Sequence, residues 1–263
     1  MIKKIAAGMF IATSLASLSL YADGSSSAIS SFLFTGGTGT GPGMSLSAPA
    51  AFGANWGQAY FGIGGAARTA TSSDVGGSAV AGVGLGNASK YVGVDANVSI
   101  ISVNPSDGGA ANEGSVSMKM FRYIPEGQYA MGSVAIGEAD MLPWGDVSTT
   151  LDPSTYVAYS QYIQLPSNFS FLATLGAGNG QFRNPSQLNG NASAQYAFFT
   201  SGAIQYKDLI SAIVDYTAQN FSAGVSLVPT KWPVSITLGM GNLNHGSGPN
   251  DYFMGSVGYL YSF

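Results

Sequence analysis

The sequence predicts an all-β fold: a transmembrane antiparallel up-and-down β-barrel of about 12 strands, preceded by an N-terminal extension. Only 8% of the 263 residues are charged, against roughly 25% in a typical soluble domain, so most of the surface is not built to face water. No stretch of about 18 apolar residues follows position 22, which argues against helical membrane spans. Many segments alternate instead between apolar and small polar residues, which is the period of a strand with two different faces.

The first 22 residues predict a secretory signal peptide that is cleaved after Ala22. Lys3 and Lys4 give it a positive start, Ile5 to Leu20 is apolar, and Ala22 is the small residue before the cut. An uncleaved membrane anchor is the alternative, although the segment is short and weakly apolar for a span. The chain has no Cys, which excludes a lipid-anchored cysteine, a disulfide scaffold and a thiolate metal site.

Residues 23–55 are interpreted as a flexible extension or a plug for the barrel. Gly, Ser, Ala and Pro dominate this stretch, as in mobile linkers. Phe32 and Phe34 would prefer a protected place, which favours partial insertion into the lumen. The Gly-rich run at 36–43 lacks the Lys-Ser/Thr of a phosphate-binding loop, so we interpret it as linker.

Residues 56–263 contain the alternating segments and form the predicted barrel. In 168–178, 220–228 and 233–242, one face is apolar and the other carries Gly, Ser, Ala and Asn. A soluble β-sandwich also alternates, but its outer face would carry Lys, Glu and Arg. Small polar residues suit the inside of a narrow barrel instead. The expected strands are 57–66, 78–87, 90–103, 115–124, 127–138, 154–165, 168–178, 195–206, 209–217, 220–228, 233–242 and 252–263.

The last strand ends on an aromatic pattern. Phe263 is the terminal residue, and Tyr261, Tyr259, Val257 and Phe253 precede it on the same face. This resembles the C-terminal assembly signal of Gram-negative outer-membrane β-barrel proteins. The resemblance implies localisation in the bacterial outer membrane, contact with its lipid and lipopolysaccharide, and insertion by the barrel-assembly machinery. A soluble secreted β-protein that happens to end in Phe is the alternative.

Two further segments, Leu175 to Arg183 and Ile213 to Pro229, resemble the barrel repeats of exopolysaccharide-associated YjbH-like proteins and related outer-membrane proteins. Those repeats carry a Gly-rich strand end and an Asp-Tyr strand before a tight hairpin. We carry no function over from this resemblance.

Loop lengths predict the orientation of the barrel. Connections after odd strands are mostly long and those after even strands short, the exception being the tight hairpin at Ala218-Gln219. Long outer loops and short periplasmic turns are typical of these barrels. Both termini are therefore expected in the periplasm, with acidic residues in the outer loops and Lys90, Lys207 and Lys231 in or beside the inner turns.

Candidate chemistry is sparse. The one histidine, His245, precedes Ser247 and Asp251 in a Gly-rich outer loop, which is poorly suited to holding three catalytic groups rigidly. Glu138, Asp140 and neighbouring acids surround Trp144 without the spacing of a calcium loop. We interpret these acids as solvated, or bridged by divalent cations to lipopolysaccharide. No enzyme activity, metal or cofactor is expected, and a net charge of −4 argues against nucleic-acid binding.

The predicted lumen face is polar and nearly neutral, with charge only at Asp95, Lys119 and Asp215. Because charge-selective pores use rings of one sign, we expect a narrow passive channel for small, weakly charged solutes. One alternative is a closed barrel that is structural or contacts polysaccharide, lipopolysaccharide or a partner protein at its surface. Arg122 falls on the outward face, so either it lies at the periplasmic rim or the strand phase slips there. The predicted lumen-lining residues are Gln58, Tyr60, Asp95, Asn97, Lys119, Ser170, Thr174, Gln205, Asp215 and Ser235.

Overall fold

The computed structural model describes residues 42–68, 75–100, 111–126, 129–145, 148, 153–184, 195–229, 234–246 and 251–263. Twelve antiparallel strands form one closed barrel in which each strand pairs with its neighbours in the sequence and β1 pairs with β12. The predicted fold class, an antiparallel up-and-down barrel, is thereby confirmed. Among the described residues, no helix is long and apolar enough to cross a membrane.

Each predicted strand segment overlaps one observed strand, with ends that differ by a few residues. The strands are β1 (Gln58–Arg68), β2 (Val75–Gly86), β3 (Gly93–Ile100), β4 (Gly114–Pro125), β5 (Ala130–Ala139), β6 (Ser154–Gln164), β7 (Phe169–Gly178), β8 (Ala197–Tyr206), β9 (Ile210–Tyr216), β10 (Phe221–Leu227), β11 (Val234–Gly241) and β12 (Tyr252–Ser262). Two short 3-10 helices, η3 (Pro166–Asn168) and η4 (Gly180–Phe182), follow β6 and β7.

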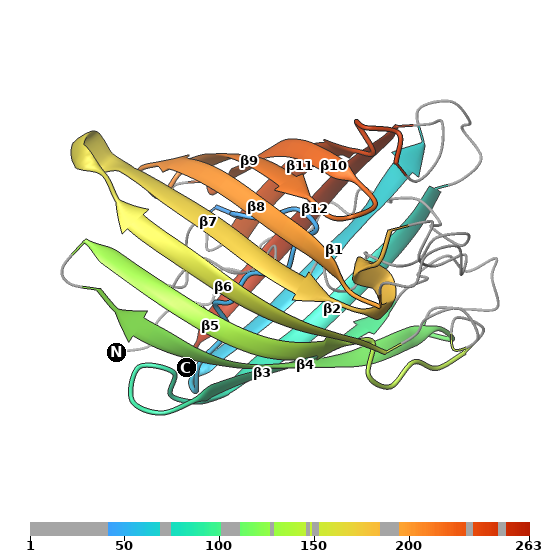
Figure 1. The fold of residues 1–263 in the computed structure, drawn as a ribbon, viewed down its shortest axis with the longest axis horizontal. Coiled ribbons are helices and arrows are strands. Elements are labelled where there is room, and N and C mark those ends of the chain that lie inside the picture. Colours follow the sequence, from blue (N-terminus) through green and yellow to red (C-terminus); the bar gives the residue numbers. More distant parts are fainter. Residues whose placement is uncertain are drawn as a thin grey trace, which may run out of the picture.

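The two ends of the barrel differ in their connections. Figure 1 shows η3 and the C-terminus at the left end and η4 at the right end. We call these the short-turn end and the long-loop end, because strands that run to the right are followed by the longer connections. The tight hairpin between β9 and β10 is the exception, and Thr217 and Asn220 close it with reciprocal backbone hydrogen bonds of 2.8 and 3.2 Å.

Alternation along each strand separates an apolar outer face from a small polar inner face. In β9, Ile210, Val214 and Tyr216 are exposed, whereas Ser211 and Asp215 are buried. β7 repeats the pattern, with Leu175 exposed and Ser170 and Thr174 buried. A one-residue shift would exchange the two faces of a strand, so this pattern fixes the register of the barrel.

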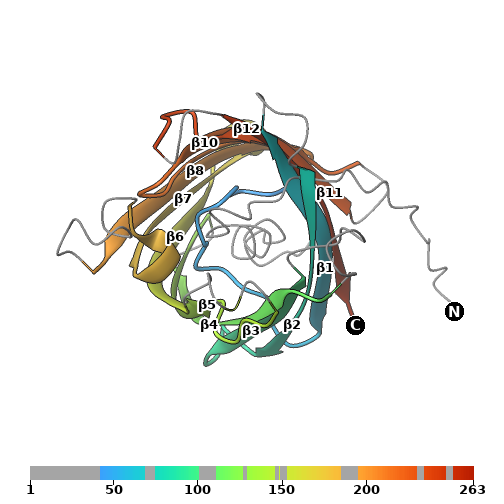
Figure 2. The same cartoon turned by 90° about the vertical axis from the view of Figure 1, so that its right-hand side faces the viewer.

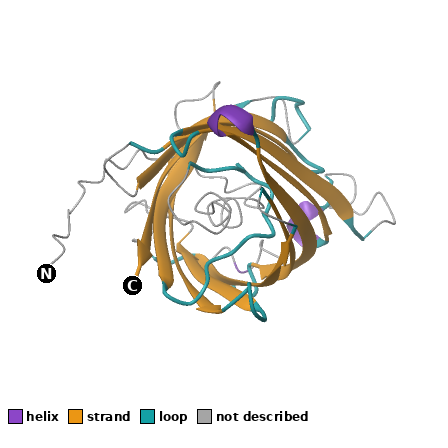
Figure 3. Cartoon of the chain, turned by 90° about the vertical axis from the view of Figure 1, so that its left-hand side faces the viewer, coloured by secondary structure: helices purple, strands orange, loops and turns teal. Residues whose placement is uncertain are grey.

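The barrel interior is occupied by chain that precedes β1. Figures 2 and 3 show residues 42–55, which we call the inner segment, running inside the ring of strands. Met44, Leu46 and Phe52 on this segment are at most 1% exposed. Residues 23–41 lie outside the described residues. The predicted plug or extension at 23–55 is thus described only over residues 42–55, and that part lies in the lumen.

Inward glycines make room for aromatic rings on neighbouring strands. A Cβ at Gly82 would lie 2.2 Å from Cζ of Tyr60, and one at Gly176 would lie 2.1 Å from Cζ of Phe199. Each ring therefore occupies the space that a side chain at the neighbouring glycine would take. This packing lets large side chains fit inside a narrow barrel that also encloses a stretch of its own chain.

Candidate functional site

The inner wall of the barrel carries three charged residues that the sequence placed in the lumen. Asp95 on β3 and Lys119 on β4 lie opposite each other in the strand register, and Asp215 lies on β9. Their side chains are 2%, 8% and 1% exposed. Burial of charge is costly unless hydrogen bonds or opposite charges compensate for it, so the partners of these three groups define the site.

Asp215 binds the first half of the inner segment. Its Oδ2 accepts hydrogen bonds from the backbone amides of Leu46, Ser47 and Ala48 at 2.7, 2.6 and 2.9 Å. The hydroxyl of Ser45 donates to the same oxygen at 2.9 Å. Successive backbone amides that surround one anionic oxygen form a nest, so the segment wraps around this single carboxylate.

Lys119 and Asp95 bind the second half. The Lys119 ammonium donates to the carbonyl oxygens of Ala50 and Phe52 at 3.1 and 2.5 Å. Asp95 Oδ2 accepts the amide of Ala54 at 3.1 Å, while its Oδ1 accepts the hydroxyl of Tyr60 at 2.6 Å. All three charged residues of the predicted lumen therefore bind backbone groups of the inner segment.

Neutral groups of the wall complete the attachment. Ser226 Oγ accepts the amide of Gly43 at 2.8 Å, and Ser211 donates to the carbonyl of the same residue. Ser160 and Ser133 bind the amide and the carbonyl of Ala51, each at 2.8 Å. Together with the charged residues, these groups come from β3, β4, β5, β6, β9 and β10, so the inner segment crosses the lumen.

The other predicted lumen residues also lie on the inner face. Gln58 Oε1 accepts the amide of Asn55 at 2.9 Å. Ser170 and Thr174 share hydrogen bonds with Tyr162 and Ser160, at 2.8 and 2.7 Å. Asn97 and Gln205 are buried and Ser235 is half-buried. The sequence analysis did not identify Tyr123, whose hydroxyl accepts a hydrogen bond from Asn55 Nδ2 at 2.9 Å. It also did not identify the serines that bind the inner segment. Alternation shows which face of a strand is polar, but not which residues pack against that face.

A second set of buried groups lies at the long-loop end. Phe182 of η4 packs against Tyr156 and Phe199, with ring centroids 5.4 and 5.0 Å apart. Gln181 Nε2 donates to Asp140 Oδ2 at 3.4 Å. Asp140, which we expected among solvated loop carboxylates, is only 1% exposed. That expectation was wrong because Asp140 turns inward in a left-handed conformation, with φ of 53°, and accepts a hydrogen bond of 2.5 Å from Ser115.

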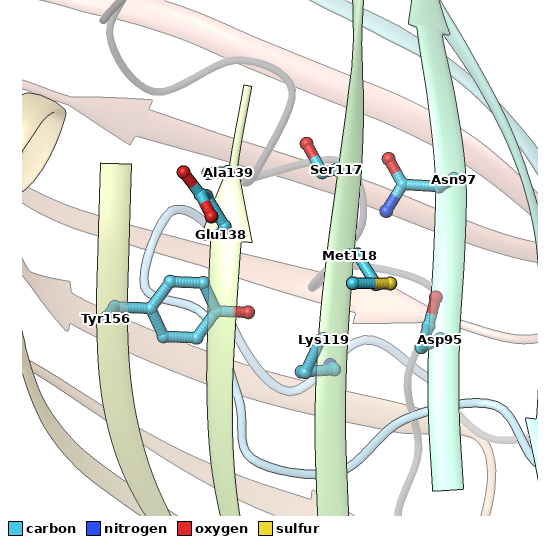
Figure 4. A pocket seen from close by; sticks show the side chains of 8 residues that line it. All are labelled: Asp95, Asn97, Ser117, Met118, Lys119, Glu138, Ala139 and Tyr156. Atoms are coloured by element: carbon cyan, nitrogen blue, oxygen red, sulfur yellow. The ribbon is translucent and has the colours of Figure 1, made fainter. Parts of the chain in front are cut away.

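A small polar pocket lies beside β3, β4 and β5. Figure 4 shows its lining, which includes Asp95, Asn97, Ser117, Lys119 and Tyr156. The pocket has a volume of about 20 Å³, and about 10–15 Å³ of such space holds one water molecule. This pocket therefore has room for about one water molecule.

The C-terminal residues predicted to form the assembly signal end the barrel at β12. Phe253 and Tyr261 are exposed, and Val257 and Tyr259 are half-buried on the same outward face. Phe263 stacks on Tyr261 and meets the edge of Trp56, with centroids 6.1 and 6.3 Å apart. Its amide donates to the carbonyl of Gly57 at 2.8 Å. The end of the chain is thus attached to the residues that precede β1.

The structure describes the remaining candidates only in part. His245 Nε2 lies 3.7 Å from Asp251 Oδ1, and the His245 side chain is 58% exposed; Ser247 lies outside the described residues. Among the residues that the structure describes, no group of three or more His, Asp or Glu side chains could hold a metal ion. Arg122 lies on the outer face and donates to the carbonyl of Tyr91 at 2.9 Å, so the strand phase does not slip there.

Comparison with known proteins finds a likeness to solved structures but none to a sequence family. No protein-family model and no curated protein sequence matches the chain. Among solved structures, it is similar to Ail, the attachment invasion locus protein of Yersinia pestis, with 10% sequence identity and a TM-score of 0.20. The match covers 79% of this chain and 99% of Ail. The C-terminal assembly signal and the YjbH-like resemblance stay predictions.

Proposed function

We propose that the chain is a bacterial outer-membrane β-barrel that acts as a narrow channel for small, weakly charged solutes and is closed at rest by its inner segment. The observation that carries this proposal is how the lumen is filled. The wall contributes mostly small polar side chains, and the space between them is occupied by a stretch of chain outside the barrel strands, attached through hydrogen bonds.

The outer face supports a membrane location. Leu175, Phe198 and Val157 are 61%, 70% and 54% exposed, and similar apolar side chains cover the other strands. Soluble monomers rarely expose large contiguous apolar patches, and an outward apolar band is what a bilayer covers. The exposed Lys90 and Lys207 lie in the short turns, away from the middle of the strands, where a charge on the lipid face is most costly.

The inner face supports a reversible plug. Asp215, Lys119 and the wall serines bind backbone groups of the inner segment, and water can replace each of these hydrogen bonds if the segment leaves. The net stability of one such exchange is only about 0.5–1.5 kcal/mol, and about 1.5–3 kcal/mol for a charged group. Displacement of the inner segment would expose a Ser-rich lumen wall, along which water and polar solutes could diffuse. The mechanism needs no reaction and no cofactor.

Proteoliposome swelling with sugars of graded size tests this function. We expect little swelling with the full mature chain and clear swelling with a variant that lacks residues 23–50, because the deletion removes most of the inner segment. A full-length Lys119→Met/Asp215→Asn variant provides a second route if the deletion does not fold. No swelling with either variant, at high density of folded barrel, would refute the channel.

A structural or surface-interaction barrel is the second candidate. It is favoured by the buried groups at the long-loop end, where Phe182 packs against Tyr156 and Phe199 and Gln181 binds Asp140. In this case the loops would contact polysaccharide, lipopolysaccharide or a partner protein, and the inner segment would be permanent packing. The swelling assay separates the two candidates, since only the channel predicts uptake after deletion.

A further inference from the structure

Three buried oxygen atoms without hydrogen-bond partners lie side by side on the inner wall. Ser201 on β8 is the register partner of Asp215 on β9, and Asp215 is the register partner of Ser222 on β10. The three residues are 4%, 1% and 0% exposed. Within the part of the chain that the structure describes, Ser201 Oγ, Asp215 Oδ1 and Ser222 Oγ all lack a hydrogen-bond partner. Buried polar atoms are almost always paired, so three unpaired neighbours indicate a common ligand.

The two oxygens of Asp215 have different surroundings. Oδ2 accepts the four close hydrogen bonds from residues 45–48 that were described above. Oδ1 accepts none. Among the described residues, the salt bridge that the structure records is between His245 and Asp251, so no cationic side chain within that part of the chain pairs with Asp215.

Neighbouring side chains limit the space around these oxygens. The Tyr252 ring on β12 lies across Gly241 on β11, where a Cβ would be 2.3 Å from the ring. From there the Tyr252 side chain interacts with that of Ser222. On the other side, a Cβ at Gly224 on β10 would lie 3.2 Å from Cδ2 of Leu46. The oxygens therefore face a confined part of the lumen.

We propose that Ser201 Oγ, Asp215 Oδ1 and Ser222 Oγ bind a monovalent cation, either an alkali-metal ion or a primary ammonium group. Hydroxyl and carboxylate oxygens are the donors that hard cations prefer. One carboxylate supplies a single negative charge, whereas protein sites for Ca²⁺ generally combine several carboxylates with six to eight oxygens. A bound cation would also compensate the buried charge, which a water molecule would not.

The proposal does not depend on channel activity, because its test is a binding measurement on the full mature chain in detergent. A ligand that binds only the folded state lowers the unfolding equilibrium constant by the factor 1 + [L]/Kd. We therefore measure thermal unfolding in NaCl, KCl, methylammonium chloride and N-methyl-D-glucamine chloride at equal ionic strength. We expect the constant to fall about tenfold for each tenfold rise of the preferred cation above its Kd, with no such fall for the bulky N-methyl-D-glucamine.

A Ser201→Ala/Ser222→Ala variant removes two of the three oxygens and leaves every contact between Asp215 and the inner segment in place. We expect it to lose the cation dependence. Ser99→Ala is the matched control, since Ser99 is also fully buried, also lacks a partner for its Oγ and lies on β3. This control should keep the dependence.

Diffraction from crystals soaked in Tl⁺, a heavy substitute for K⁺, supplies an independent readout. An anomalous peak among the three oxygens, absent from the double variant, would support the site. A response to methylammonium alone would assign it to ammonium groups rather than to alkali ions. Equal stabilisation by all four salts, or a cation dependence and Tl⁺ peak that both persist in the double variant, would overturn the proposal in favour of ordered water.

Discussion

The buried ammonium of Lys119 on β4 donates a hydrogen bond to the backbone carbonyl oxygen of Ala50 at 3.1 Å. Lys119 is the one Lys or Arg side chain that is buried among the described residues. Its charge therefore faces the inner segment instead of an aqueous pore. One positive charge on an otherwise neutral pore wall would indicate weak anion selectivity. The Lys119 ammonium is bound instead to backbone carbonyl oxygens of the same chain.

Replacement of Lys119 by Met should destabilise the barrel by about 2–5 kcal/mol. The variant loses two charge-assisted hydrogen bonds to the inner segment and leaves Asp95 without the opposite charge on the next strand. Thermal or urea unfolding in detergent measures the loss. Lys207→Met is the control, because Lys207 is exposed in a short turn, and it should change stability by less than about 1 kcal/mol. Equal effects of the two substitutions would show that Lys119 does not hold the segment.

Asp215→Asn should loosen the first half of the inner segment. The amide keeps the shape of the carboxylate but removes the negative charge from a nest of backbone amides, so each hydrogen bond weakens. The chain has no Cys, so Ser47→Cys supplies a single reporter on the half-buried position beside Asp215. We expect maleimide labelling of this Cys to be about tenfold faster or more in the Asp215→Asn background, which corresponds to about 1.4 kcal/mol.

Asp208→Asn is the matched control for this measurement, because Asp208 is an exposed carboxylate that accepts a hydrogen bond from Gln205 at 3.0 Å. Labelling should stay at the rate of the parent Ser47→Cys protein. If labelling is unchanged in Asp215→Asn as well, the Asp215 nest is not what holds residues 45–48.

Gly176→Ala should destabilise the barrel by about 1–3 kcal/mol, the usual cost of overpacking. The new Cβ would lie 2.1 Å from Cζ of Phe199 and 2.6 Å from the carbonyl oxygen of Val157, so the ring or the strand must move. Gly202→Ala is the control, since the nearest atom to its Cβ would be 3.8 Å away. The midpoint of unfolding should fall for the first variant and stay nearly constant for the second.

Sequence alternation predicted the strands well because it reflects which face is apolar. Asp95, Lys119 and Asp215 were placed on the lumen side for this reason. The partners of these residues were not predictable, since Ser45–Ala48 and Ala50–Ala54 show no pattern that distinguishes a lumen segment from a linker. The burial of Asp140 was not predictable from the sequence either. It stands in an acidic stretch typical of a solvated loop, and only the left-handed turn at that position directs it into the barrel.

Removal of the His245 imidazole should leave stability and any measured activity unchanged. Its contact with Asp251 is 3.7 Å long and largely exposed, and such pairs contribute about 0–1 kcal/mol. His245 has φ of 54°, a conformation that Asn tolerates better than Ala, so His245→Asn is the clean test. Hydrolysis of lipid A or of ester substrates by the parent protein, lost in this variant, would contradict the prediction that the chain is not an enzyme.

Phe182→Ala should affect conductance only when the inner segment is absent. Phe182 is 3% exposed and packs between Tyr156 and Phe199 at the long-loop end, so its removal widens that end while residues 42–55 still cross the lumen. In planar bilayers, we expect Phe182→Ala alone to resemble the full mature chain, and its combination with deletion of residues 23–50 to conduct more than the deletion alone. Unfolding measurements accompany the recordings, because loss of a buried Phe costs about 3–5 kcal/mol. A single Phe182→Ala variant that conducts as well as the deletion would place the main closure at the long-loop end and not at the inner segment.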